Sequence, residues 1–294
     1  MLTQRARYWL ALSTLLLLVS LGLACGGKKT EDNGGGGTDT GGGNKYAKTG
    51  NEGTIKGKVA VTGTVPEPKK IDTSADAVCA QKNPNAMTED VVVKDGKVQY
   101  TFVYIKDGTT TDGKKIGDFS FDTPTNAVVL DQNGCHYKPH MIGLQVNQKL
   151  SVTNSDPTQH NVHPTPKSNE EWNQSQGPNA PPIEKTFKRA ETLIPVKCNQ
   201  HPWMKAYIGV LKHPFFAVTK EDGTFEITGV PAGKYTVVAW HEKFGEKTME
   251  VNVAAKGSGT ADFSYDAAGA TANAPEGGSL QIMPALEFPM LVKH

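Results

Sequence analysis

Apolar and polar residues alternate in short runs along most of the chain, and Gly, Asn, Asp and Pro separate these runs. Alternation with a period of two, in runs rich in Val, Ile, Thr, Phe and Tyr, predicts β-strands. The predicted strands are Thr54–Val61, Lys97–Ile105, Ala127–Leu130, Ile142–Val146, Lys149–Thr153, Lys185–Phe187 and Tyr207–Leu211. No long stretch after the N-terminal apolar run has helical periodicity. We therefore predict an all-β protein, and the close spacing of the strands favours β-sandwiches.

A second group of strands begins near His213. It consists of Phe216–Thr219, Asp222–Ile227 and Lys234–Trp240, with a turn at Pro231-Ala232-Gly233 before the last strand. Each turn contains the Gly, Pro or Asp that its backbone requires, so this region predicts a β-meander. Trp240 falls on the alternation of core-facing positions, which predicts a buried side chain rather than an exposed binding platform.

The C-terminal pattern resembles a known sandwich family. Asp222-Gly223-Thr224-Phe225 followed by Val230-Pro231-Ala232-Gly233-Lys234-Tyr235 is similar to the carboxypeptidase regulatory-like, transthyretin-like domains. The resemblance implies a small prealbumin-like β-sandwich with a structural or partner-docking role, and carbohydrate binding is the alternative. Thr54–Val61 resembles the opening strand of the same sandwich, so the intervening domain would be an insertion.

The N-terminus predicts export. Arg5 and Arg7 precede an apolar run from Tyr8 to Leu23 that is short for a membrane span, and Cys25 follows the small residue Ala24. This segment resembles a bacterial lipoprotein signal, which implies that Cys25 becomes the lipidated first residue and anchors the protein to a membrane. An ordinary secretory signal is the alternative, and both place the protein in the cell envelope.

The segment Cys198-Asn199-Gln200-His201-Pro202-Trp203-Met204 contains the strongest chemical signal in the chain. A thiolate, an imidazole and a thioether lie three residues apart, and His160 upstream offers a second imidazole after a predicted strand and turn. Two imidazoles, one thiolate and a weak axial thioether form the ligand set of a mononuclear blue-copper centre. Zinc is an alternative, although zinc sites usually contain more thiolates or carboxylates. A metal-free, structural Cys198 is the other alternative.

The ligand pattern resembles the cupredoxin family, in particular its amicyanin-like and pseudoazurin-like branch. The resemblance covers about residues 97–212 and implies a Greek-key β-sandwich that binds one type 1 copper ion through His160, Cys198, His201 and Met204. Val196 and Ala206 depart from the family pattern, whereas the ligand set is intact. Asn161 would link its loop to the backbone near Cys198 and, with Asn199, would orient the ligands. His163 is expected to be a solvent-exposed loop residue.

Composition argues against one class of partner, and the cysteines indicate a disulfide and argue against haem. The chain has 31 basic and 30 acidic residues and no basic stripe, which argues against a nucleic-acid partner. If Cys25 carries lipid and Cys198 binds copper, Cys79 and Cys135 remain, and we predict that they form a disulfide in an oxidising compartment. The absence of a Cys-x-x-Cys-His motif argues against haem.

The predicted organisation has six parts. They are a signal peptide at 1–24, a flexible Gly-rich linker at 25–53, a β segment at 54–96, the copper domain at 97–212, the second sandwich at 213–266 and a low-complexity tail at 267–294.

The function that we expect is one-electron transfer with a transient redox protein partner. Electrons would leave through His201, across an apolar patch that includes Pro202 and Trp203. A copper carrier or buffer, and a carbohydrate-binding or adhesion module, are the alternatives. We expect no enzymatic activity, because the sequence lacks the His-x-His clusters of multicopper oxidases.

Overall fold

The structure is a computed structural model that describes residues 43–268. Its described part consists of β-strands, one α-helix, α1 (Ala77–Lys82), and a short 3-10 helix, η1 (Ile116–Asp118). This confirms the all-β prediction. Neither described helix is long and apolar enough to cross a membrane. The predicted signal peptide (1–24), Cys25, the linker up to residue 42 and the tail beyond residue 268 lie outside the described residues.

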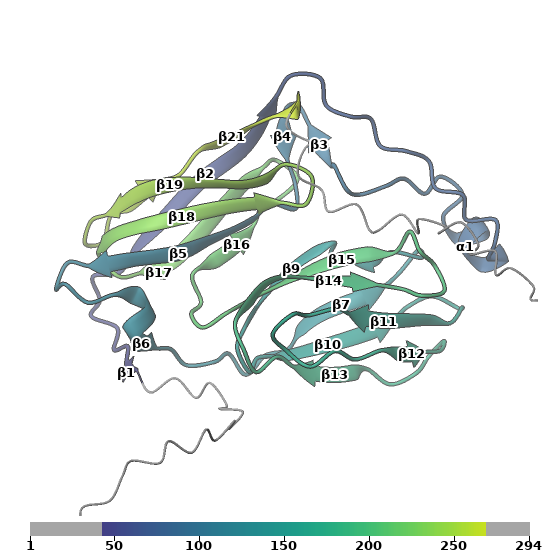
Figure 1. The fold of residues 1–294 in the computed structure, drawn as a ribbon, viewed down its shortest axis with the longest axis horizontal. Helices are drawn as coiled ribbons and strands as arrows, with labels where there is room; N and C mark the ends of the chain where they lie inside the picture. The colour runs from purple at the N-terminus through teal and green to yellow at the C-terminus, as the bar shows by residue number, and fades with distance from the viewer. Residues whose placement is uncertain (1–42, 269–294) are drawn as a thin grey trace, which may run out of the picture. The chain divides into compact units, whose positions relative to one another are not determined.

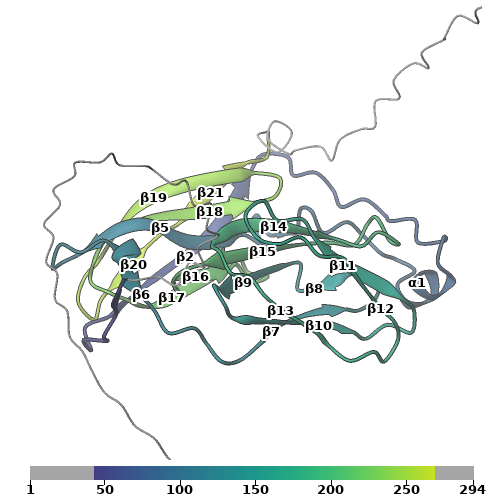
Figure 2. The same ribbon diagram turned by 60° about the horizontal axis from the view of Figure 1, so that its bottom comes forward.

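Nine strands form one two-sheet sandwich, which we call sandwich A. One sheet has the order β13-β10-β7-β8 and the other the order β12-β11-β14-β15-β9 (Figure 1). The strands are β7 (Val128–Gln132), β8 (Tyr137–Lys138), β9 (Met141–Gln145), β10 (Lys149–Asn154), β11 (His160–Pro164), β12 (Gln174–Gln176), β13 (Ile183–Thr186), β14 (Glu191–Lys197) and β15 (Lys205–Leu211). Figure 2 shows the two layers, with β14 and β15 in one and β7 and β10 in the other. Fully buried Leu130, Leu144, Leu150 and Ile194 belong to the core of this sandwich.

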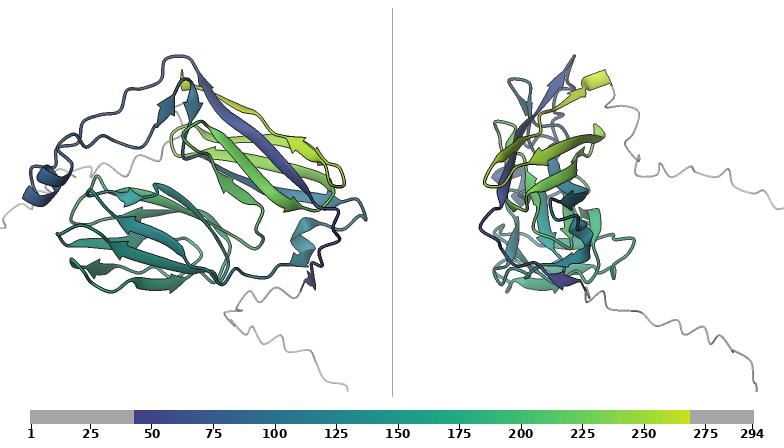
Figure 3. Two further views of the ribbon diagram at one scale, coloured as in Figure 1. Left: turned by 180° about the vertical axis from the view of Figure 1, so that it is seen from behind. Right: turned by 90° about the vertical axis from the view of Figure 1, so that its left-hand side faces the viewer.

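Ten other strands form a second sandwich, sandwich B. Its sheets have the orders β16-β5-β18-β19 and β17-β2-β4-β3, and β20 and β21 also pair with β2. The strands are β2 (Gly53–Thr62), β3 (Val93–Lys94), β4 (Lys97–Val98), β5 (Phe102–Thr110), β16 (Phe216–Val218), β17 (Thr224–Val230), β18 (Gly233–His241), β19 (Gly245–Val253), β20 (Ser258–Thr260) and β21 (Phe263–Asp266). In the view from behind, β2 (indigo) lies beside the yellow-green strands β20 and β21 (Figure 3).

Sandwich A is therefore inserted into sandwich B, and its N-terminal boundary differs from the predicted one. The sequence analysis assigns residues 97–212 to the copper domain, but β4 and β5 pair with strands of sandwich B. Val103 and Ile105 of β5 are fully buried in the core of sandwich B. The two-residue period predicts a strand at this position but contains no information about its partner, which explains the difference.

Part of the predicted flexible linker is structured. Within residues 43–53, β1 (Asn44–Lys45) pairs in parallel with β6 (Phe119–Ser120). The ring of Tyr46 packs against Phe119 and Phe121 at centroid distances of 5.4 Å each. Tyr46 thus makes apolar contacts that order this part of the segment, although the Gly-rich composition around it predicts flexibility.

Two facing glycines allow close packing between the sandwiches. Gly143 of β9 and Gly209 of β15 are direct partners in the sheet of sandwich A. A Cβ atom at Gly143 would lie 2.3 Å from the Phe216 ring, and one at Gly209 would lie 2.4 Å from the Phe102 ring. Both rings come from sandwich B. The absence of two side chains therefore creates the surface on which these aromatic rings pack.

A buried histidine also connects the two sandwiches. His140, next to β9, donates from Nε2 to Glu242, next to β18, and its Nδ1 lies 3.8 Å from Glu89 Oε2. Burial alone lowers the pKa of His140, but the hydrogen bond and charge of Glu242 and the charge of Glu89 outweigh this effect and raise it. The rings of Tyr100 and Tyr207 pack beside it.

Gly209→Ala should destabilise the protein, because its methyl group overlaps the Phe102 ring. We expect a loss of about 1–3 kcal/mol in the free energy of unfolding, measured by denaturant titration. Gly177→Ala is the matched control, since a Cβ atom there meets nothing within 4 Å. Equal stability of the two variants would contradict the packing described here.

The contribution of His140 should depend on pH. Its pKa is raised in the folded state, so its stabilising effect is fully present below the ordinary histidine pKa of about 6.5 and is lost as the pH rises through the folded value. The difference in denaturation midpoint between the wild type and His140→Gln should therefore shrink towards alkaline pH. A difference that grows with pH would show that His140 is not stabilised by its carboxylate neighbours.

Candidate metal centre

The structure brings three of the four predicted ligands into one cluster. A ring nitrogen of His160, Sγ of Cys198 and a ring nitrogen of His201 lie within 4.8 Å of one another. All three residues are buried. His160 begins β11, Cys198 follows β14, and His201 lies in the turn that leads to β15, so adjacent strands of one sheet deliver the cluster to one end of sandwich A.

Met204 lies in the same closed turn. The backbone N–H of Met204 donates to the carbonyl of His201 (2.9 Å), and the N–H of Cys198 donates to the carbonyl of Met204 (3.3 Å). The side chain of Met204 is fully buried in the core cluster that also contains Cys198. The loop therefore closes between Cys198 and Met204, and the thioether of Met204 is shielded from water.

The orientation of both imidazoles is set by carboxylates. His160 Nε2 lies 3.0 Å from Asp156 Oδ2, and His201 Nε2 lies 3.1 Å from Asp76 Oδ2. A carboxylate only accepts, so each Nε2 carries the proton, and Nδ1 is left for another partner. The two Nδ1 atoms face each other at 2.9 Å, and Sγ of Cys198 lies 3.7 Å from His201 Nδ1.

These groups fit a bound cation. Burial lowers the pKa of His160, but the hydrogen bonds and charges of Asp156 and Cys198 outweigh burial and raise it to about 9. For Cys198, burial raises the pKa of the thiol. Hydrogen bonding with His160 and with the Asn161 N–H outweighs burial and lowers this pKa overall. Two imidazole nitrogens and one cysteine sulfur thus converge on one position, where the raised pKa of His160 and the lowered pKa of Cys198 both favour a positive charge beside the sulfur. This donor set suits copper better than a hard cation.

Asn161 connects the two ligand-bearing segments. Its Oδ1 accepts the backbone N–H of Asn199 at 2.6 Å and lies 3.3 Å from Cys198 Sγ. Its own backbone N–H points to the same sulfur at 3.5 Å. His163 lies on β11, where it contacts Asn199 and Glu171 rather than the ligand atoms.

The two orienting carboxylates were missed in the sequence. Asp156 lies four residues before His160 in the Ser-Asp-Pro turn, and this spacing is a signal that could have identified it. Asp76 lies 125 residues from His201, at the N-terminus of α1, and no local pattern connects the two residues.

The cysteine pair forms a disulfide beside the cluster. Cys79 of α1 is bonded to Cys135, in the turn between β7 and β8, with a Cα–Cα distance of 5.6 Å. Cys198 is the free cysteine among the described residues. The indole N–H of Trp203 donates to the carbonyl of Cys135 at 3.1 Å, so the disulfide also contacts the ligand loop.

The predicted exit patch differs from an open apolar surface. His201 is only 4% exposed, because Asp76 covers its Nε2 edge, whereas Pro202 is exposed and Trp203 is half-buried. The rings of His201 and Trp203 lie 5.1 Å apart. Contact with the outside therefore runs through Pro202 and Trp203 rather than through His201 itself.

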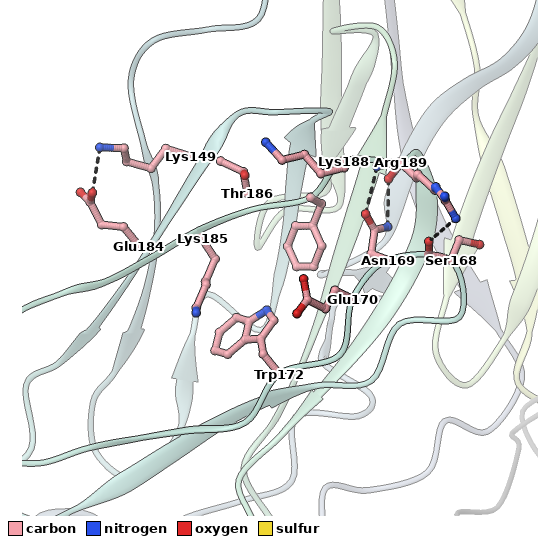
Figure 4. Close-up of a pocket in the computed structure, with 11 residues that line it drawn as sticks. Lys149, Ser168, Asn169, Glu170, Trp172, Glu184, Lys185, Thr186, Lys188 and Arg189 are labelled. Carbon is pink, nitrogen blue, oxygen red and sulfur yellow. Dashed lines mark hydrogen bonds and ion pairs between the residues drawn. The ribbon is translucent and has the colours of Figure 1, made fainter. Parts of the chain in front are cut away.

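A large surface hollow of about 810 Å³ contains none of the ligands. It is lined by residues of β10 and β13 and by residues 168–170, 172 and 187–189. Figure 4 shows the Lys149–Glu184 ion pair at one side and Lys185 beside the ring of Trp172. The Lys149–Glu184 pair that lines this hollow is exposed, whereas His160, Cys198 and His201 are buried.

No protein-family model matches the chain, and no curated protein matches its sequence. Similar solved structures include amicyanin from Paracoccus versutus, with 16% identity over 37% of this chain and 96% of that chain and a TM-score of 0.27. A purple cupredoxin from Nitrosopumilus maritimus has 17% identity over 29% of this chain and 97% of that chain, with a TM-score of 0.24. At these identities the likeness concerns the fold of part of the chain.

A copper-containing nitrite reductase from Thermus scotoductus is also similar, with 19% identity over 29% of this chain and a TM-score of 0.27. The matched part spans 22% of that enzyme's length. One of the structures to which this chain is similar is thus an enzyme, and the expectation that the protein is not an enzyme is not upheld.

Proposed function

We propose that this protein binds one copper ion through His160, Cys198 and His201, with Met204 as a weak fourth donor, and transfers single electrons. The observation that favours this function is the pair of Nδ1 atoms that face each other 2.9 Å apart beside a buried cysteine sulfur. Copper bound to this donor set supplies one-electron redox chemistry that requires no change of ligands.

The residues of the chain favour a centre that changes little in shape between oxidation states. Asp156 and Asp76 hold the imidazole rings, and Asn161 ties the Cys198 segment to the His160 segment. All three metal-binding side chains are at most 4% exposed, so water does not compete for the site. A centre that is rigid and dry has little to reorganise when an electron arrives or leaves.

The exposed surface next to the centre is the proposed contact for a transient redox protein. Pro202 is exposed and Trp203 is half-buried, and the Trp203 ring packs on His201. A small, apolar contact suits a partner that must bind and leave quickly.

Export and membrane attachment through Cys25 belong to the same proposal. The disulfide between Cys79 and Cys135 favours an oxidising compartment such as the cell envelope. Sandwich B would then serve as a scaffold or docking domain. Trp240 is half-buried and its ring lies 5.3 Å from that of Tyr207, so it faces sandwich A and does not form a free platform for carbohydrate.

Substitution of the thiolate should identify the metal. Copper-loaded wild-type protein should show intense visible absorption from thiolate-to-copper charge transfer, and Cys198→Ser should lose it. Met204→Leu should keep the colour and raise the reduction potential, because it removes the axial donor. Optical spectra and voltammetry check both outcomes. A colourless wild type that binds zinc stoichiometrically would overturn the proposal.

A charge at the exposed proline should slow electron exchange. We expect Pro202→Glu to lower the rate constant of electron self-exchange by about tenfold, equivalent to about 1.4 kcal/mol, with an unchanged optical spectrum. NMR line broadening in mixtures of oxidised and reduced protein measures this rate. Pro202→Gln is the matched control, because it removes the proline ring without adding charge. If both variants exchange at the wild-type rate, the contact surface lies elsewhere.

A further inference from the structure

The outer edge of His201 is covered by a residue from outside sandwich A. Asp76 belongs to residues 63–92, which connect β2 to β3 in sandwich B, and we call this connection the cap segment. Its carboxylate Oδ2 lies 3.1 Å from His201 Nε2. Figure 1 shows the cap segment leaving β2 and placing α1 beside the end of sandwich A.

The Asp76 carboxylate is itself fixed. Its Oδ1 accepts the backbone N–H groups of Val78 (2.8 Å) and Cys79 (3.1 Å) and so caps α1. Its Oδ2 also accepts the hydroxyl of Thr158 at 3.0 Å. With these bonds made, Oδ2 can face His201 in only one direction, so the ring is held with Nδ1 towards the other ligands.

An equivalent arrangement holds the other imidazole. Asp156, which bonds to His160 Nε2, accepts the backbone N–H groups of Gly134 and Cys135 at 2.8 Å each. Each half of the disulfide thus donates its backbone N–H to the carboxylate that orients one imidazole. The Cys79 sulfur, an Asp76 oxygen and a His201 ring nitrogen lie within 4.8 Å of one another, as do the equivalent atoms of Cys135, Asp156 and His160.

The geometry points to Asp76 as a positioning residue for the ligand His201, and to the Cys79–Cys135 disulfide as the link that keeps both orienting carboxylates in place. This inference rests on the proposed copper function. A helix of six residues is too short to be stable alone, so α1 requires a tie to sandwich A. The disulfide, which joins residues 56 positions apart, provides it.

Substitutions at Asp76 separate the positioning role from helix capping. Asn and Ser both cap helices well. Ser is too short to reach His201, and Asn can place its own N–H group against the Nε2–H, where neither group accepts a hydrogen bond. Asp76→Asn and Asp76→Ser should weaken copper binding about 10- to 100-fold and raise the reduction potential. Competition titration and voltammetry measure these effects. Asp72→Asn is the matched control, because Asp72 is exposed in the same segment and bonds to Ser74. Values within twofold of this control in both Asp76 variants would overturn the inference.

The metal-free protein offers a test that does not depend on copper. Side-chain ¹⁵N NMR should show the His201 ring protonated at Nε2 in the wild type and a mixture of tautomers in Asp76→Asn. A wild-type ring protonated at Nδ1 would overturn the positioning role. By contrast, a colourless copper-loaded wild type with the expected tautomer would overturn the proposed function and leave the orientation of His201 established.

The role of the disulfide is tested by a mutant cycle. Cys79→Ala with Cys135→Ala should weaken copper binding at least as much as Asp76→Ser does, and adding Asp76→Ser to the double variant should cause little further loss. Circular dichroism of the metal-free variants verifies that both sandwiches remain folded. Additive losses would show that the disulfide stabilises the fold without positioning Asp76 and would overturn that part of the inference.

Discussion

The hydrogen bonds from two imidazole Nε2–H groups to two carboxylates determine the candidate centre. Without Asp156 and Asp76, either ring could turn or change tautomer, and the Nδ1 lone pairs would no longer converge beside Cys198. Placing carboxylates next to a buried site costs desolvation energy. That cost is offset by backbone N–H donors from Gly134, Cys135, Val78 and Cys79, which supply each carboxylate with further partners.

This constraint explains why parts of the molecule that are distant in sequence are joined. Sandwich A contains the candidate ligands and one of the carboxylates, but the second carboxylate comes from the cap segment of sandwich B. The disulfide and the His140–Glu242 contact each connect sandwich A to residues that belong to, or lead into, sandwich B. Gly143 and Gly209 add a close-packed aromatic contact at the same junction. Sandwich B is therefore part of the support of the candidate centre.

The sequence predicts those features that depend on local order. Cys198, His201 and Met204 lie within seven residues, and a tight loop between two strands brings them together whatever the rest of the fold does. Strand positions follow from the two-residue period, but their partners do not, and β4 and β5 were accordingly assigned to the wrong sandwich. Asp76 was missed for the same reason, since its contact with His201 arises only from the folded chain. The burial of His201, and hence its absence from the predicted exit patch, is a consequence of that contact.

The insertion of one sandwich into the other has a consequence for biosynthesis. A ribosome or an export channel delivers the chain from its N-terminus, so β2 and β5 appear before sandwich A, whereas their partners β17 and β18 appear only after it. Sandwich A can pair all its strands, and α1 can dock on it, while β2 and β5 still have unpaired edges. Such edges recruit other chains. During synthesis, sandwich B is therefore the part that is exposed to aggregation, because β2 and β5 wait for their partners. Sandwich A is complete earlier.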